Sequence, residues 1–225
     1  PKAAGHDLVH SIMEKVTGKP IGVLDYVALE AMGDLVPDFV EGVALASSQH
    51  STLVLGGESA EMKDTYQSGV FDAFVHVLSL GKEDGLDISR FIQGMERPLL
   101  VASTDGTGTK TKIVRNPQDI ICHGLNDIGA QGVRPAAFAL YISGNVPRRE
   151  LEAIDRDANA ISRYLGIHKF PSIISIKPDF YLPGEVDIAG TVVGFVDREN
   201  IIKGKDVIPS DVIIGIGVDN PMTNG

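Results

Sequence analysis

Cysteine and long apolar runs are nearly absent from this sequence, and tryptophan is missing altogether. Cys122 is the single cysteine in 225 residues, so the chain can form neither an intramolecular disulfide nor a cysteine-rich metal site. No stretch approaches the roughly 20 apolar residues that a membrane-spanning helix needs, and no apolar run follows basic residues at the N-terminus. We therefore expect a cytoplasmic protein with no membrane partner.

Basic residues are also scarce. Lysine and arginine total 20 against 30 acidic residues, which gives a net charge of −10. This balance excludes the global positive field that drives sequence-independent binding to nucleic acid, so an anionic substrate needs a local site. Hydrophobic residues make up 43% of the chain, enough to build a core, and no low-complexity tract interrupts it. We expect an ordered globular protein that binds no nucleic acid.

The apolar residues predict alternating helices and strands. Spacings of three and four predict helices at 5–16, 37–49, 120–131 and 148–165. Apolar, β-branched runs predict strands at 21–27, 51–55, 70–80, 99–101, 136–141, 172–176 and 188–196. The expected fold class is α+β, with mixed sheets, helices packed on one face of each sheet, and open sheet faces available for association.

The order of elements recurs along the chain and predicts two related segments, 1–87 and 88–225. Aligning residues 18–20 with 133–135 places Tyr26 over Tyr141, and residues 71–78 fall over 187–194. Identity between the segments is low. An alternative is that any two strand-helix-strand segments would align equally well, because this order is common to many folds.

Residues 104–110 (TDGTGTK) combine the groups that a polyphosphate site needs, directly after an apolar run. Gly106 and Gly108 let backbone N–H groups approach phosphate oxygens, Lys110 supplies a positive charge, and Asp105 offers an oxygen ligand to Mg²⁺. The Walker A pattern is absent from the sequence, so that general nucleotide rule does not apply. A glycine-rich hairpin turn is the alternative interpretation.

Residues 56–62 (GGESAEM) place two glycines and two carboxylates after a predicted strand. If a helix begins here, Glu58 and Glu61 point to one side of it, because they are three residues apart. Such a pair favours metal coordination. The alternative is a helix N-terminus whose first-turn acids interact favourably with the helix dipole.

Other chemically active residues give weaker signals. Asn126 and Asp127 suit a polar site, but such a pair also caps helices or forms turns. The six histidines show no metal-binding spacing, so we expect each to be a surface or core residue rather than a ligand. No Ser-His-Asp or Cys-His arrangement is close in sequence, and we expect Cys122 to be structural.

Together these stretches resemble the signature set of the aminoimidazole ribonucleotide synthetase family, also called phosphoribosylformylglycinamidine cyclo-ligase. The set consists of residues 24–26 (LDY), 56–62, 105–110, 126–127 and the following Gln131-Gly132-x-x-Pro135. The sequence at 186–194, 201–206, 209–214 and 223–225 also resembles the end of that family's N-terminal, ATP-binding domain. Nearly the whole chain is covered by the resemblance.

The resemblance implies ATP and Mg²⁺ as cofactors, a phosphoribosyl substrate, and closure of formylglycinamidine ribonucleotide to aminoimidazole ribonucleotide in purine biosynthesis. It implies metal ligation by Asp105, Asp127 and Glu58, and catalytic roles for Asp105, Lys110 and Asp127. The nucleotide-binding residues that it implies are Gly56, Gly57, Gly106, Thr107, Gly108, Thr109, Lys110 and Asn126. Family members are homodimers whose ATP sites depend on adjoining N-terminal domains.

The chain departs from the family in the order of its motifs. The GGE motif precedes DGTGTK, whereas in the family it follows. The first segment keeps Asp25 and GGE but has Ser11 and Ile12 where the family has Asn-Asp, while the second segment has Leu140 in place of Asp25. We therefore hypothesise that the two segments pair as a pseudo-dimer and rebuild one composite site.

The family's C-terminal domain is not recognised in these residues, so a separate partner carrying it is an alternative to a homodimer or pseudo-dimer. Two other functions stay open. One is a related ATP-using enzyme that resembles selenophosphate synthetase, thiamine-monophosphate kinase or the glutamine-dependent amidotransferase of the preceding step, although GGESAEM argues against these. The other is a non-catalytic nucleotide-binding or assembly subunit.

Overall fold

The computed structural model of the chain describes residues 1–81, 85–215 and 217. The family-like ending at 223–225 lies outside these residues. The helices are α1 (Lys2–Met13), α2 (Leu35–Gln49), α3 (Ser89–Ile92), α4 (Pro117–Gly129) and α5 (Arg148–Leu165), with 3₁₀ helices η1 (Gly108–Lys112) and η2 (Arg198–Asn200). The strands are β1 (Lys19–Leu29), β2 (Leu53–Glu61), β3 (Phe71–Leu80), β4 (Pro98–Gly106), β5 (Arg134–Gly144), β6 (His168–Lys169), β7 (Ile173–Ile176) and β8 (Val186–Asp197).

The strands form two mixed sheets. In the first, β1 is central, with β2 parallel on one side and β3 antiparallel on the other. In the second, β8 pairs antiparallel with β4 and β5, and β5 pairs parallel with β6 and β7. The α+β class and the mixed sheets expected from the sequence are confirmed.

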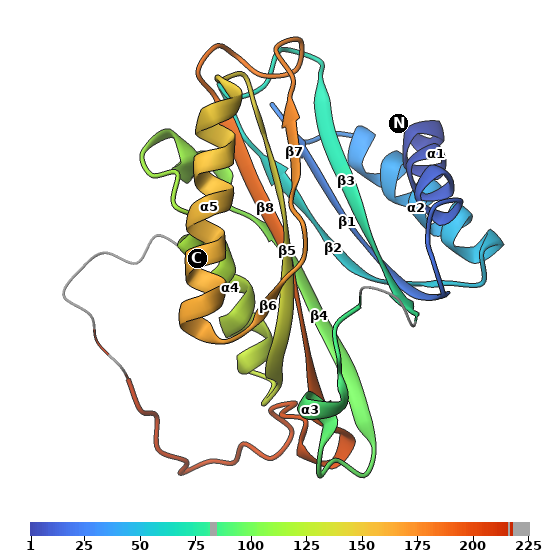
Figure 1. Cartoon of the computed structure of the whole chain (residues 1–225), viewed down its shortest axis with the longest axis vertical. Helices are drawn as coiled ribbons and strands as arrows, with labels where there is room; N and C mark the ends of the chain where they lie inside the picture. The colour runs from blue at the N-terminus through green and yellow to red at the C-terminus, as the bar shows by residue number, and fades with distance from the viewer. Residues whose placement is uncertain (82–84, 216, 218–225) are drawn as a thin grey trace.

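Helices cover the outer face of each sheet, so that the strands lie between two helical layers, as Figure 1 shows. Helices α1 and α2 pack on the first sheet through a core that includes Val9, Phe39 and Val43. Helices α4 and α5 pack on the second sheet; α5 buries Leu151, Ile154 and Ala158, whose spacing of three and four puts them on one face. Among the described residues, no helix has both the length and the apolar character needed to cross a membrane.

The two sheets share one internal topology. The order β2-β1-β3 in the first corresponds to β7-β5-β8 in the second, with the same parallel and antiparallel pairings. Tyr66 and Tyr181, which are 115 residues apart, hydrogen-bond to each other through their hydroxyls. Because Tyr26 pairs with Phe74 and Tyr141 with Ala189, the sequence alignment of 71–78 with 187–194 is wrong by one residue.

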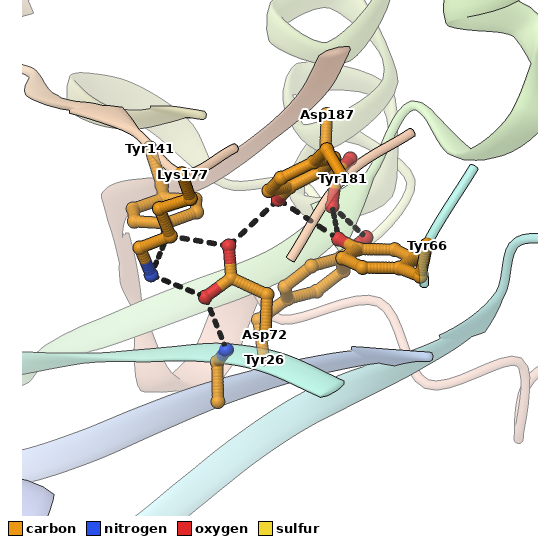
Figure 2. A network of polar contacts seen from close by, with 8 residues as sticks. Tyr26, Tyr66, Asp72, Tyr141, Lys177, Tyr181 and Asp187 are labelled. Atoms are coloured by element: carbon orange, nitrogen blue, oxygen red, sulfur yellow. Dashed lines mark hydrogen bonds and ion pairs between the residues drawn. The ribbon is translucent and has the colours of Figure 1, made fainter. Parts of the chain in front are cut away.

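The inner faces of the sheets enclose a polar network, drawn in Figure 2. Tyr26 and Tyr66 donate to Asp187 Oδ2 at 3.1 and 2.8 Å. Tyr141 and Tyr181 donate to Asp72 Oδ2 at 2.7 and 2.6 Å. The carboxylate of each segment therefore accepts hydrogen bonds from two tyrosines, both of which belong to the other segment.

The stretch GGESAEM forms strand rather than the start of a helix, because residues 53–61 pair in parallel with β1. Alternate residues of a strand point to opposite faces, so Glu58 and Glu61 do not share a side. A helix beginning here was the condition for both carboxylates to lie on one face, and that condition is not met. Glu61 instead accepts a hydrogen bond from the N–H of Met32.

Candidate functional site

A cluster of three ionisable side chains forms where the end of β4 meets α4. His123 Nε2 lies 3.0 Å from Asp105 Oδ2 and 3.6 Å from Asp127 Oδ1. His123 and Asp127 are four residues apart on α4, which places them on the same face of the helix. All three side chains are partly exposed, so a ligand can reach them from solvent.

Each carboxylate of the cluster has its other oxygen held by a donor of the protein. Ser103 Oγ donates to Asp127 Oδ2 at 2.9 Å, and the N–H of Gly106 donates to Asp105 Oδ1 at 2.6 Å. These bonds fix the orientation of both carboxylates, as outer partners do at metal sites. Asp105 Oδ2 and Asp127 Oδ1 consequently face His123.

The DGTGTK stretch continues from β4 into η1. A side chain at Gly106 would collide with Tyr26, whose hydroxyl lies 2.4 Å from where a Cβ would stand, so this position needs glycine. Gly108 has φ +67°, a left-handed conformation that favours glycine. The Thr107 hydroxyl is buried and has no hydrogen-bond partner within the described part of the chain. The turn from β4 into η1 therefore depends on glycine at both positions, and the Thr107 hydroxyl between them lies inside the protein.

The lysines at the end of this stretch have defined partners. Lys110 Nζ lies 2.8 Å from Asp119 Oδ2, and both side chains are about one-quarter exposed. Lys112 Nζ donates to the backbone carbonyl of Asp64 at 2.7 Å, which ties η1 to the chain that follows β2. Lys110 is thereby held at the surface of the loop beside α4.

The GGE stretch of the first segment lies near this loop, because β2 runs close to β4. Asp25 is buried on β1 next to Gly57, and burial raises the pKa of its carboxyl to about 6. Glu58 is exposed and accepts a hydrogen bond from the N–H of Ser59 at 2.7 Å. Glu58 is thus outside the cluster of Asp105, His123 and Asp127.

Of the residues expected in a site, the fold brings Asp105 and Asp127 together and places Lys110 nearby. Asn126 is exposed on α4 beside Asp127. His123 was not expected to be a ligand, because the six histidines show no metal-binding spacing in the sequence. The four-residue interval to Asp127 on a predicted helix was the signal that could have found it.

The three clustered side chains fit a divalent cation. Their ligand atoms all lie within 4.8 Å of one another, the one such group of three among the residues that the structure describes. Carboxylate oxygens are the ligands that Mg²⁺ prefers, and two of the three donors are of this kind. Asp105 and Asp127 could therefore hold Mg²⁺, as the sequence predicts.

Comparison with known proteins establishes the family. The sequence pattern of "AIR synthase related protein, N-terminal domain" matches residues 1–81 and 95–196. These matches cover most of the chain and include both the GGE and the DGTGTK stretches. The chain therefore belongs to the AIR synthase related family, and the resemblance seen in the sequence is confirmed.

Curated relatives carry the name phosphoribosylformylglycinamidine cyclo-ligase. The enzyme of Alkaliphilus metalliredigens (strain QYMF) is 36% identical over 140 residues, which cover 58% of this chain and 40% of the relative. That of Clostridium tetani (strain Massachusetts / E88) is 31% identical over 175 residues, covering 73% of this chain and 49% of the relative. The chain spans less than half the length of either relative.

Solved structures show more distant similarity. The hydrogenase maturation protein HypE of E. coli is 15% identical with a TM-score of 0.42, covering 56% of this chain and 41% of that one. Thiamine-monophosphate kinase of Stenotrophomonas maltophilia K279a is 18% identical with a TM-score of 0.37, covering 62% and 39%.

Proposed function

We propose that this chain forms the nucleotide-phosphate and metal site of an ATP-dependent cyclo-ligase that converts formylglycinamidine ribonucleotide to aminoimidazole ribonucleotide. The observation that carries the proposal is the meeting of Asp105, at the start of the DGTGTK loop, with Asp127 of α4. Lys110 of the same loop is ion-paired to Asp119 of that helix. The names of the curated relatives support the reaction class.

In this proposal Asp105 and Asp127 hold Mg²⁺, and Lys110 adds positive charge near the phosphates. The N–H groups of Gly106 and Thr107 already bond to Asp105 and to the carbonyl of Ile188. The first N–H groups of a 3₁₀ helix have no acceptor within the helix, so those of Gly108 and Thr109 are the candidate phosphate donors. Bound Mg-ATP would supply the phosphoryl group that activates the amide oxygen of the substrate.

The proposed site is composite, with β2 of the first segment contributing to the loop of the second. Three contacts support this: Gly106 packs on Tyr26, Lys112 bonds to Asp64, and β2 lies close to β4. In this arrangement the two segments act as the pseudo-dimer that the motif order suggested. Gly56, Gly57 and Glu58 would then face the nucleotide from the other segment, in a nucleotide-bound state.

The test is calorimetric binding of Mg-ATP together with release of ADP in the presence and absence of formylglycinamidine ribonucleotide. We expect Asp105→Asn and Asp127→Asn each to weaken Mg-ATP binding by tenfold or more, an effect of about 1.4 kcal/mol or larger. Asp157→Asn, an exposed carboxylate on α5, is the matched control and should bind as the wild type does. Unchanged affinity in both site variants would contradict the proposal.

Two further outcomes divide the proposal into parts. ADP release that depends on the amidine substrate supports complete cyclo-ligase activity, whereas binding without turnover supports a nucleotide-binding role alone. Glu58→Gln tests the composite site, with Glu61→Gln on the same strand as its control. If Glu58→Gln leaves Mg-ATP affinity untouched, the composite site is wrong while the Asp105 site stands.

A further inference from the structure

The histidine between the two site carboxylates changes the chemistry of the cation that this site accepts. Asp105 and Asp127 alone offer oxygen donors, which suit the hard cation Mg²⁺. His123 adds an imidazole nitrogen at 3.0 and 3.6 Å from the carboxylate oxygens that face it. Imidazole nitrogen binds first-row transition metals far better than it binds Mg²⁺.

The arrangement is ordered as a ligand set rather than as a loose surface cluster. The bonds from Ser103 and from the N–H of Gly106 occupy the outer oxygen of each carboxylate. Asp105 Oδ2 and Asp127 Oδ1 are left facing His123 Nε2, at 3.0 and 3.6 Å. These two separations match those of neighbouring ligands around a single cation at about 2.0–2.2 Å.

We infer that His123 is a third metal ligand and that the site prefers a first-row transition-metal dication, such as Mn²⁺ or Co²⁺, over Mg²⁺. This inference rests on the proposed function, because it concerns the same two carboxylates. It extends the proposal by naming a ligand and a class of cation. Mg²⁺ binds the same site through Asp105 and Asp127, but more weakly than a cation that also binds the imidazole nitrogen.

The competing role for His123 is that of a cation in its own right. A protonated imidazole between two carboxylates would bridge them as an ion pair and exclude a metal. The two roles predict opposite effects of removing the ring. A ligand's loss weakens metal binding, whereas loss of a bridging cation leaves metal binding unchanged or strengthens it.

The experiment measures binding of Co²⁺, Mn²⁺ and Mg²⁺, each alone, to the full chain by calorimetry. In the wild type we expect Co²⁺ to bind at least about tenfold more tightly than Mg²⁺, following the general order of divalent affinities. In His123→Gln we expect Co²⁺ affinity to fall at least about tenfold, with Mg²⁺ affinity changed little, because the nitrogen ligand is lost. Glutamine is neutral, so this variant removes both the nitrogen ligand and any bridging cation, and thermal unfolding checks that it folds.

A second histidine pair provides the control. His10 Nδ1 lies 3.0 Å from His50 Nε2 on the surface of the first segment, which is another place where a transition metal could bind imidazole. His50→Gln should leave Co²⁺ affinity unchanged. If His50→Gln removes the tight site, if His123→Gln does not, or if the wild type shows no preference, the inference is overturned.

Mg-ATP binding on the same proteins separates this inference from the proposed function. Wild-type protein that prefers Co²⁺ but binds no Mg-ATP would contradict the nucleotide site while keeping the ligand set. Mg-ATP binding that depends on Asp105, together with equal affinity for Co²⁺ and Mg²⁺, would contradict only the role of His123.

Discussion

The two segments keep matching positions in the interior but differ where chemistry is expected. On the inner faces, Tyr26 and Tyr66 donate hydrogen bonds to Asp187. In the same way, Tyr141 and Tyr181 donate to Asp72. On the outer face of the second segment, α4 presents His123 and Asp127. The corresponding positions of α1, 115 residues earlier, are Leu8 and Ile12, which pack on the first sheet's core. The comparison teaches that the shared core maintains the pairing, while one segment alone carries the ionisable cluster.

The interior is also asymmetric at Met62 and its counterpart Lys177. Lys177 Nζ lies 2.5 Å from Asp72 Oδ1 and donates to the hydroxyl of Tyr141 at 2.8 Å. Met62 offers only a weak contact to the Tyr26 hydroxyl, with 3.9 Å between oxygen and sulfur. Asp187 thus has neutral donors alone, and burial raises the pKa of its carboxyl to about 6.

Of the changes considered, removal of the Asp72 carboxylate should lower the stability of the protein most. In Asp72→Ala, Lys177 and the hydroxyls of Tyr141 and Tyr181 lose their shared acceptor inside the protein. We expect the free energy of unfolding at pH 7 to fall by about 3–5 kcal/mol, as when one partner of a buried ion pair is removed. Denaturant unfolding measures the loss, and Asp179→Ala, an exposed carboxylate, should change stability little. A loss below 1 kcal/mol would mean that Asp72 does not hold the two sheets together.

The buried carboxylate of Asp25 should lower the stability of the protein, whereas its counterpart Leu140 carries no ionisable group that would do so. Because burial raises its pKa to about 6, the folded state binds a proton more tightly than the unfolded state does. The wild type therefore loses stability from this group as pH rises from about 4 to about 6, and the cost is complete above that range. We expect Asp25→Asn to be more stable at pH 7 by up to about 3 kcal/mol, and about equal to the wild type near pH 4.

Thermal unfolding from pH 4 to pH 7 checks the Asp25 prediction. Burial lowers the pKa of His76 to about 4, so that group costs stability as pH falls, in both proteins alike. Because the His76 contribution is the same in the wild type and in Asp25→Asn, it cancels when the stability of one is subtracted from that of the other. An Asn variant that is less stable than the wild type at pH 7 would contradict the prediction.

The sequence predicted the helices, the principal strands and the presence of a repeat, because apolar periodicity and Gly-rich turns are local signals. The alignment of 71–78 with 187–194 was wrong by one residue, because sequences of low identity do not define a register. The register is determined by cross-strand pairs such as Tyr26 with Phe74. It also favoured a helix after Gly57. The parallel pairing of β2 with β1 overrides that local preference. Sequence spacing does not reveal this pairing.

The site was predicted only in part. Asp105 and Asp127 were expected together because both belong to a recognisable signature, and the fold brings them to His123. The tyrosine and aspartate network was not expected at all. Its members are scattered over the chain and look like ordinary core aromatics until the two sheets face each other.

Replacing Lys177 by methionine, the residue at its counterpart Met62, tests how much the lysine contributes to the difference between the segments. In Lys177→Met, Asp72 keeps its tyrosine donors but loses its cation, which makes the second segment resemble the first. We expect a loss of about 2 kcal/mol at pH 7, discounted because the lysine is about one-quarter exposed. Denaturant unfolding measures the loss, and Lys63→Met, at an exposed lysine, is the control. A Lys177→Met variant as stable as the wild type would contradict the prediction.

The smallest expected effect compares the two equivalent tyrosines, Tyr26 and Tyr141. Tyr141 makes bonds to both Asp72 and Lys177, at 2.7 and 2.8 Å, whereas Tyr26 makes one bond to Asp187, at 3.1 Å. We expect Tyr141→Phe to cost about 1 kcal/mol and Tyr26→Phe about 0.5 kcal/mol, because each removes the hydroxyl but keeps the ring. Denaturant unfolding of both variants in the wild-type and Lys177→Met backgrounds separates the causes. If Lys177 causes the difference, the stability losses of Tyr141→Phe and Tyr26→Phe become equal in the Lys177→Met background. If the two losses stay unequal, the different geometry of the two tyrosines is the cause.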